Sequence, residues 1–157
     1  MAFLVNNLEF HLQVDVIDSL QRELEQAIRD ASDFAVVEQA HAKFMDALIT
    51  RSFLHNKVIR NTIDTVLRRC LRFCNLVGKF SRLESLVESA DKEMAMSELD
   101  ANFAELSQSF TRDSSFLYAL LARINSNLLL RVDYNGHFGA LAKGEIKYVL
   151  NASTKAT

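Results

Sequence analysis

The residues that could carry out chemistry are few in this 157-residue chain, and its two cysteines come first. Cys70 and Cys74 stand one helical turn apart, so both thiols could face one point. A structural zinc ion would need two further ligands, and none stands at a suitable spacing. We therefore expect both cysteines to behave as small apolar side chains in a helix seam. Two cysteines are also too few for a disulfide framework, which favours a reducing, intracellular setting.

The histidines and carboxylates form no catalytic pattern. The four histidines are dispersed, and they do not form a helical two-histidine zinc motif. His41 falls on the apolar face of an expected helix, where we predict a hydrogen-bonded core histidine. Asp30 and Asp33 would need a buried cleft to act as acid and base, and they are better interpreted as helix-end residues. Without a phosphate-binding loop or a nucleophile elbow, the sequence predicts no enzyme, no metal and no cofactor.

Arg68, Arg69 and Arg72 form a compact cluster within a larger basic band. Residues 51–82 contain eight basic residues and one acidic residue, whereas residues 1–50 contain nine acidic and three basic residues. No aromatic residues interleave with these arginines, so nucleic-acid binding is not predicted. The band could bind an acidic protein partner, or its charges could pair with neighbouring helices, because helix surfaces commonly alternate in sign.

The charge and hydropathy of the chain argue against two further classes of partner. The net charge is -2, which implies no general attraction to nucleic acid or to an anionic membrane. No apolar run approaches the ~20 residues that a membrane span requires. We expect neither a nucleic-acid partner nor a membrane partner.

The distribution of helix breakers predicts an all-α fold. The chain contains no proline and four glycines, the first of them at Gly78. A sheet-rich fold needs turns every several residues, and the first 77 residues of this sequence contain neither proline nor glycine. We expect an antiparallel bundle of about five helices over residues 1–135, followed by an irregular or disordered tail over residues 136–157.

Capping residues and breaks in the apolar pattern place the expected helix boundaries. The cleanest heptad spacing follows the break at His55-Asn56, and its apolar seam suits antiparallel packing. A capping box from Ser81 to Glu84 predicts a separate short helix. The first expected helix covers residues 2–31, and the second runs from a cap at Ser32 or Asp33 to His55. The third covers residues 57 to about 80 and the short fourth covers 81 to about 90. After a surface connection over 91–97, the fifth covers 98–130.

The first expected helix is apolar on two opposite sides. One stripe consists of Leu4, Leu8, Leu12 and Val16, and the other consists of Phe3, Phe10, Val14 and Ile17. A surface helix of a small domain needs only one such stripe. A helix with two stripes is packed between layers, so we expect the chain to be the last piece of a longer protein. The stripe of Phe3, Phe10, Val14 and Ile17 is then an exposed packing surface through which the chain could self-associate.

Three blocks of the sequence, in order, resemble the gamma-tubulin complex component family. The segment MAFLVNNLEFHLQVDVIDS is similar to the long helix of the family's C-terminal domain, with Phe10-His11 in place of the usual aromatic pair. Asp33-Phe34, Ala40-His41 and Phe44-Met45 are similar to a second stretch, and residues 129–135, LLRVDYN, to the terminal block. The chain is identified as a member of this family, nearest to its component 4 subtype.

The resemblance implies a structural role with no catalytic step. Family members sit side by side in a ring-like complex, and their helical C-terminal domain holds gamma-tubulin, so that a ring of gamma-tubulins templates microtubule nucleation. The implied partners are gamma-tubulin and other complex components. The implied location is the cytoplasm and cytoskeleton, at a microtubule-organising centre or spindle pole. The alternative is a free-standing helical adaptor that binds a partner helix in a groove.

Two sets of residues are candidates for contact with gamma-tubulin. The first is the basic cluster of Arg68, Arg69 and Arg72. The second lies in the LLRVDYN block and consists of Arg131, Asp133 and Tyr134. The second set has a structural alternative, in which Arg131 and Asp133 pair with neighbouring helices and Tyr134 closes the end of the bundle.

Overall fold

The structure is a computed structural model that describes residues 1–85, 90–124 and 126–133. Every regular element in these ranges is helical. The elements are α1 (Ala2–Phe10), the π-helical segment η1 (His11–Asp18), α2 (Ser19–Arg29), α3 (Phe34–Arg51), α4 (Lys57–Glu84), α5 (Ala90–Arg123) and α6 (Asn127–Val132). Because α1, η1 and α2 follow one another without a break, the described residues form five helices. The predicted all-α fold is confirmed.

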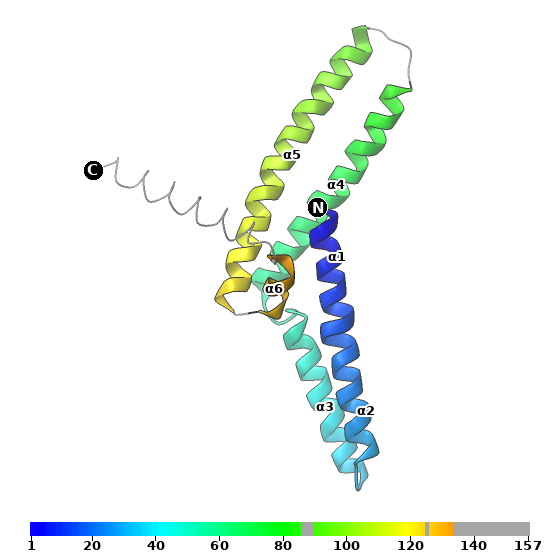
Figure 1. Cartoon of the computed structure of the whole chain (residues 1–157), viewed down its shortest axis with the longest axis vertical. Coiled ribbons are helices and arrows are strands. Elements are labelled where there is room, and N and C mark those ends of the chain that lie inside the picture. The colour runs from blue at the N-terminus through cyan, green and yellow to red at the C-terminus, as the bar shows by residue number, and fades with distance from the viewer. Residues whose placement is uncertain (86–89, 125, 134–157) are drawn as a thin grey trace, which may run out of the picture.

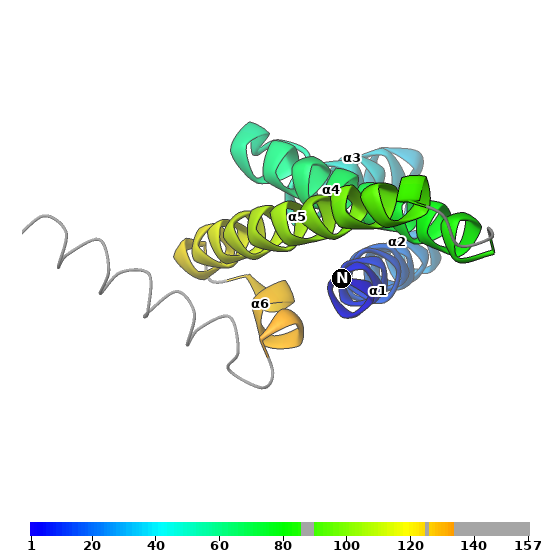
Figure 2. The ribbon, with the colours of Figure 1, turned by 90° about the horizontal axis from the view of Figure 1, so that it is seen from above.

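The helices form two antiparallel hairpins at opposite ends of an elongated molecule. Helices α2 and α3 make one end, and α4 and α5 make the other (Figure 1). The N-terminal helix α1 and the short α6 lie between these ends and contact each other. Seen from above, both lie on the same side of the α4–α5 pair (Figure 2). The middle of the molecule is therefore the place where the two hairpins are joined.

The starts of α3 and α4 follow from side chains that accept hydrogen bonds from free backbone N–H groups. Asp33 Oδ1 accepts from the backbone N of Val36 at 3.0 Å, as predicted for the start of α3. Asn56 Oδ1 accepts from the backbone N atoms of Val58 and Ile59 at 3.2 Å each, which confirms the break before α4.

The largest core cluster lies where α1, α4, α5 and α6 meet. Its buried members come from all four helices and include Leu121, which has no exposed surface. The first apolar stripe of the N-terminal helix contributes Leu4 and Leu8 to this cluster, and Val16 is buried farther along the same stripe. A smaller cluster of Leu76, Leu99 and Leu106 lies between α4 and α5 farther out.

Two predicted boundaries in the α4–α5 hairpin are wrong. The pattern from Ser81 to Glu84 does not begin a new helix, because α4 runs through it and Ser81 Oγ donates to the carbonyl of Val77 at 3.2 Å. Phe80 and Leu83 pack against the outer core cluster. That packing outweighs the ~1 kcal/mol cost of Gly78 in a helix. The expected connection over 91–97 belongs to α5, which begins at Ala90.

Two further predictions need correction. The last expected helix does not continue to residue 130, because Ser126 caps a new helix, α6, by accepting from the backbone N of Leu128 at 3.2 Å. His41 is exposed rather than part of a core. Helix α3 has only a narrow covered face, since it packs mainly against α2, and no residue of α3 is fully buried.

Some predictions lie outside the described residues. These are the tail over 136–157, and with it the expected end of the bundle at residue 135. In the described ranges, no helix is long and apolar enough to cross a lipid bilayer.

Candidate functional site

The joint between the two hairpins is held by an ion pair between residues that are 116 positions apart. Arg131 on α6 donates from Nε to Oδ2 of Asp15 at 2.6 Å and from Nη2 to Oδ1 at 2.7 Å. Such a two-point contact fixes orientation as well as distance. The guanidinium carbon also lies 4.3 Å from the centre of the Phe10 ring, in a cation–π contact. Arg131 therefore pairs with a neighbouring helix, as the structural alternative predicted.

The charge state of this pair follows from its hydrogen bonds. The hydrogen bond from Arg131 lowers the pKa of Asp15 below its ordinary value, although partial burial opposes this effect. The same bond raises the pKa of Arg131. Both groups therefore stay charged at neutral pH, and Asp15 stays charged into the acidic range.

His11 supports the joint from the side of the N-terminal helix. Its side chain is buried, with Nδ1 at 3.4 Å from Oδ2 of Asp15, and its ring stacks on Phe53 with centroids 5.8 Å apart. Phe53 has a positive φ of 61°, which a phenylalanine adopts only when its surroundings hold it. The π-helical turns begin at His11, and such turns within an α-helix frequently occur at functional sites.

Asp133 joins α6 to α5. Burial raises the pKa of the Tyr118 hydroxyl, and the charge of Asp133 and a hydrogen bond to it raise that pKa further. Asp133 thus also has a partner on a neighbouring helix, in agreement with the structural alternative. Tyr134, the third candidate of this block, lies outside the described residues.

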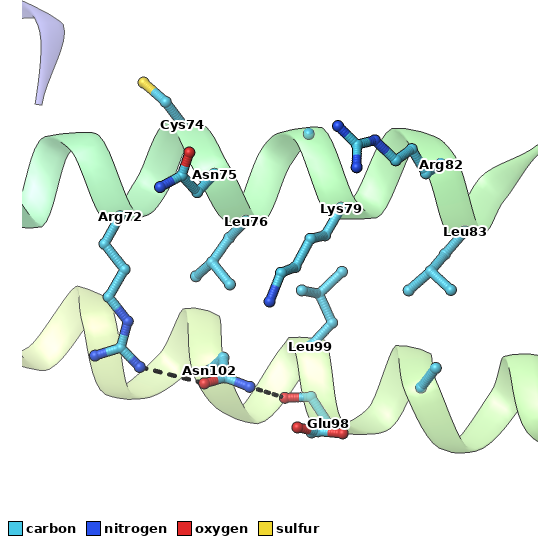
Figure 3. A pocket seen from close by; sticks show the side chains of 12 residues that line it. Arg72, Cys74, Asn75, Leu76, Lys79, Arg82, Leu83, Glu98, Leu99 and Asn102 are labelled. Atoms are coloured by element: carbon cyan, nitrogen blue, oxygen red, sulfur yellow. Dashed lines mark hydrogen bonds between the residues drawn. The ribbon is translucent and has the colours of Figure 1, made fainter.

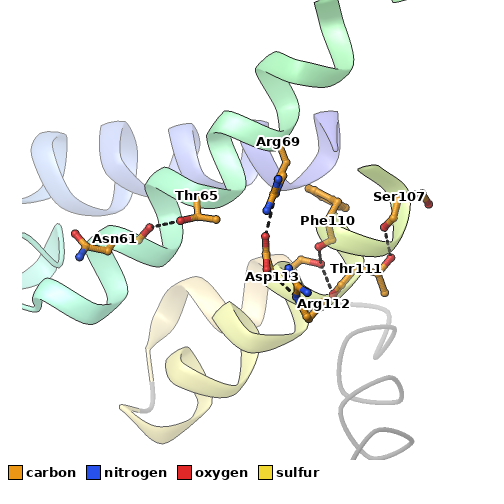
Figure 4. Close-up of polar contacts among 9 residues, drawn as sticks. Asn61, Thr65, Arg69, Ser107, Phe110, Thr111, Arg112 and Asp113 are labelled. Atoms are coloured by element: carbon orange, nitrogen blue, oxygen red, sulfur yellow. Dashed lines mark hydrogen bonds and ion pairs between the residues drawn. The ribbon is translucent and has the colours of Figure 1, made fainter. Parts of the chain in front are cut away.

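Two of the three clustered arginines pair with α5 rather than point freely into solvent. Arg69 Nε lies 3.1 Å from Oδ2 of Asp113, and both side chains are mostly buried (Figure 4). Arg72 Nη2 lies 3.1 Å from Oε2 of Glu105 and 3.2 Å from Oδ1 of Asn102. These contacts link α4 to α5, so at these two positions the basic band pairs with the neighbouring helix.

Arg68 differs from the other two arginines. Its side chain is 75% exposed, and its ion pair, at 2.8 Å, is with Asp64 one turn earlier on the same helix. This hydrogen bond raises the pKa of Arg68. Because exposed pairs of this kind contribute little stability, Arg68 is the member of the cluster most accessible to a partner.

A groove lies beside the outer half of the α4–α5 hairpin, with a volume of about 720 Å³. Figure 3 shows Leu76 and Lys79 of α4 extending toward α5, with Leu99 of α5 opposite them. Arg82 also lines the groove. Within the described part of the chain, Lys79 and Arg82 have no ion-pair partner. The groove therefore combines an apolar floor with two available positive charges.

The second stripe of the N-terminal helix is partly open to solvent. Phe3, Phe10 and Ile17 are 43%, 44% and 38% exposed, and Val14 is half-buried. Exposed apolar side chains in one line on a helix are typical of a packing surface.

The cysteines show no reactive arrangement. Cys70 is half-buried and Cys74 is exposed. Burial raises the pKa of the Cys70 thiol, which disfavours the nucleophilic thiolate. The described residues contain no group of three or more histidine, cysteine or carboxylate side chains that could hold a metal ion.

The partner of Arg131 was not predicted from the sequence. Asp15 belongs to the QVDV segment and Arg131 to the LLRVDYN segment, so two of the blocks that carry the family resemblance meet in one ion pair. The opposite charges of Asp15 and Arg131 in these two blocks were the only signal for this ion pair. No local spacing connects residues that are so far apart in the sequence.

The sequence of this chain is similar to known proteins. A family model described as "Gamma tubulin complex component C-terminal" matches residues 1–138. "Gamma-tubulin complex component 4" of Arabidopsis thaliana is 32% identical over 159 residues, which cover 95% of this chain and 20% of that protein. The protein of the same name from Homo sapiens is 34% identical over 146 residues, which cover 88% of this chain and 20% of that protein.

The chain spans about a fifth of the length of these curated relatives. The match with a C-terminal family model agrees with the predicted partial C-terminal domain, and the relatives agree with the predicted resemblance to component 4. Because the family model covers most of its residues, the chain belongs to the gamma-tubulin complex component family.

Proposed function

We propose that this chain is a structural part of a gamma-tubulin complex subunit that binds gamma-tubulin and so helps to template microtubule nucleation. The observation that carries the proposal is the match of the C-terminal family model to residues 1–138. The proposed partners are gamma-tubulin and other components of the complex. The proposed location is the cytoplasm and cytoskeleton, at a microtubule-organising centre or spindle pole. The role is one of binding and scaffolding, without a catalytic step.

The candidate contact residues differ in how freely they can meet a partner. Arg69, Arg131 and Asp133 hold helices of this chain together, so we assign them to positioning the contact surface. Arg68 is mostly exposed and Arg72 partly so, and both can add contacts without giving up the fold. We propose that these two side chains face gamma-tubulin, and we keep Tyr134 as a further contact residue.

A binding measurement with purified gamma-tubulin tests the proposal. We expect the chain to retain gamma-tubulin in a pull-down and Arg68→Glu to weaken that binding by about tenfold, because the reversal introduces repulsion at the interface. Arg60→Glu is a matched control on α4, since Arg60 is also exposed and lies outside the cluster. Unchanged binding by Arg68→Glu would contradict the assigned surface. Absence of binding by the unaltered chain would contradict gamma-tubulin binding by this part of the protein.

The exposed stripe of Phe3, Phe10 and Ile17 favours a second candidate function, a helical adaptor that binds an amphipathic partner helix. In this case serine substitutions at Phe3 and Ile17 abolish partner binding, whereas reversal at Arg68 leaves it unchanged. If gamma-tubulin is the partner, Arg68→Glu weakens binding and the serine substitutions at Phe3 and Ile17 leave it unchanged. A pull-down with both variants therefore separates the two functions.

A further inference from the structure

The two ends of the molecule carry complementary surfaces, and the first of these is the groove of the α4–α5 hairpin. Its floor contains Leu76 and Leu99, each 5% exposed, and the neighbouring Leu83 (Figure 3). Lys79, which extends toward α5, and Arg82, on the side of α4 away from α5, add positive charge, and Glu98 of α5 is the one carboxylate in the same lining (Figure 3). The groove is thus suited to an apolar side chain flanked by carboxylates.

Small residues keep this groove open. Gly78 and Ala95 both line it. A Cβ atom added at Gly78 would meet no atom within 4 Å, so space is available beside the backbone of α4.

The second surface is the turn between α2 and α3 at the opposite end (Figure 1). Phe34, the first residue of α3, is 79% exposed, the largest exposed fraction among the large apolar side chains described. Glu38 lies one turn after Phe34 and shares its side of the helix. Asp30 and Asp33 lie in the turn itself, and both are exposed. This end therefore presents one aromatic ring surrounded by carboxylates.

We propose that the α2–α3 end of one copy of this chain docks into the α4–α5 groove of a second copy. In this contact Phe34 lies on the leucine floor, and Asp30 and Glu38 face Lys79 and Arg82. The occupant is a second copy because one chain supplies both surfaces, with matching apolar and charged groups. The two surfaces lie at opposite ends of the elongated molecule, so one copy cannot close the contact on itself (Figure 1).

The geometry determines how such an assembly would behave. The contact is head-to-tail, so it leaves a free groove on one copy and a free turn on the other, and further copies can add in a row. A single helix turn in a groove buries less than the ~1,200 Å² of a standard stable interface. The association is therefore weak, dependent on concentration and sensitive to salt.

Sedimentation velocity of the full chain over a concentration series tests the proposal. We expect the average mass to rise with concentration at low salt and to fall in about 1 M NaCl, where the Debye length is ~3 Å. The double variant Lys79→Glu/Arg82→Glu and the single variant Phe34→Ser each weaken association by about tenfold. The matched control Lys57→Glu/Arg60→Glu changes two exposed charges on the same helix outside the groove and leaves association unchanged.

A charge-swap experiment makes the test specific. In a mixture of Lys79→Glu/Arg82→Glu with Asp30→Lys/Glu38→Lys, the reversed groove meets the reversed turn and the unaltered groove meets the unaltered turn. Both contacts are attractive, so mixed assemblies form at concentrations at which each variant alone is monomeric. Circular dichroism confirms that each variant is helical, as expected for exposed positions. A monomeric unaltered chain at millimolar concentration would overturn the proposal. Normal association of the groove variants would also overturn it. This includes the result that serine substitutions at Phe3 and Ile17 prevent association while the groove variants still associate. None of these outcomes depends on gamma-tubulin binding.

Discussion

The two hairpins have the same local design but are stabilised in different ways. The α4–α5 hairpin has buried leucines on both helices and two ion pairs between them, Arg69 with Asp113 and Arg72 with Glu105. The α2–α3 hairpin has one fully buried residue, Leu20, and no residue of α3 is fully buried. Helix formation alone therefore does not determine the stability of a hairpin, because most helical stability comes from packing between helices.

This difference has a functional consequence. Elements with few buried contacts open more easily, and binding surfaces are often drawn from them. Both hairpins expose some large apolar side chains, Phe34 in the first and Leu71 and Met94 in the second, but only the α4–α5 hairpin buries apolar side chains from both of its helices. We expect the first hairpin to be the adaptable end of the molecule and the second to be its rigid support.

The largest expected effect comes from the central core that anchors the rigid hairpin. Leu121→Ala removes a fully buried side chain where four helices meet, and we expect it to lower the free energy of unfolding by about 3 kcal/mol. The matched change Leu24→Ala in α2 affects a half-buried side chain and should cost less than about 1.5 kcal/mol. Urea denaturation measures both. Equal losses would contradict the difference between the hairpins.

A smaller effect is expected at the joint that connects the hairpins. Asp15→Asn keeps the shape of the side chain but removes its charge, and we expect a loss of about 1–2 kcal/mol after allowance for partial exposure. Because the pKa of Asp15 is lower in the folded chain than in the unfolded chain, the carboxylate stabilises the fold fully only above its unfolded pKa.

The same joint predicts a dependence on pH. As the pH falls from about 4 through the lower folded pKa of Asp15, the unaltered chain loses this contribution, whereas Asp15→Asn has none to lose. The difference in stability between the two proteins should therefore shrink on acidification. Urea denaturation at a series of pH values measures it, and a difference that stays constant down to about pH 2 would exclude the ion pair as its source.

The helix caps give a third and more local comparison. Asp33→Ala and Asn56→Ala each remove side-chain acceptors from the start of a helix, and each should cost about 1 kcal/mol. In the weakly packed α3 the loss should appear as faster amide hydrogen exchange along the helix. In α4, exchange should increase only near the first turn, because the central core holds the rest. Similar patterns in both helices would show that packing does not separate the hairpins.

The smallest effect is expected at Arg68. Arg68→Ala breaks an exposed pair within α4, so the denaturation midpoint should stay unchanged within error. Asp113→Asn, which leaves the mostly buried Arg69 without its partner, should lower the midpoint measurably. If the two variants behave alike, the ion pairs between α4 and α5 do not distinguish this hairpin.

Local signals made much of the fold predictable from the sequence. The lack of proline and the caps at Asp33 and Asn56 act over a few residues, so helix type and two helix starts could be predicted correctly. The pattern at Ser81 has the same local form but does not begin a helix, because packing against α5 keeps α4 continuous. The start of α6 at Ser126 was not predicted, although serine is a common N-cap residue, because the apolar spacing continues through this position.

The sequence by itself determined the all-helical class, the buried stripe of Leu4, Leu8 and Val16, and the family to which the chain belongs, because each depends on residue types and short spacings. Only the tertiary structure decided which charges pair. Asp15 meets Arg131 across 116 positions, and Arg69 meets Asp113 across 44. A pairing at such separation depends on how whole helices pack, and helix packing is set by the shared apolar core rather than by the charged residues themselves.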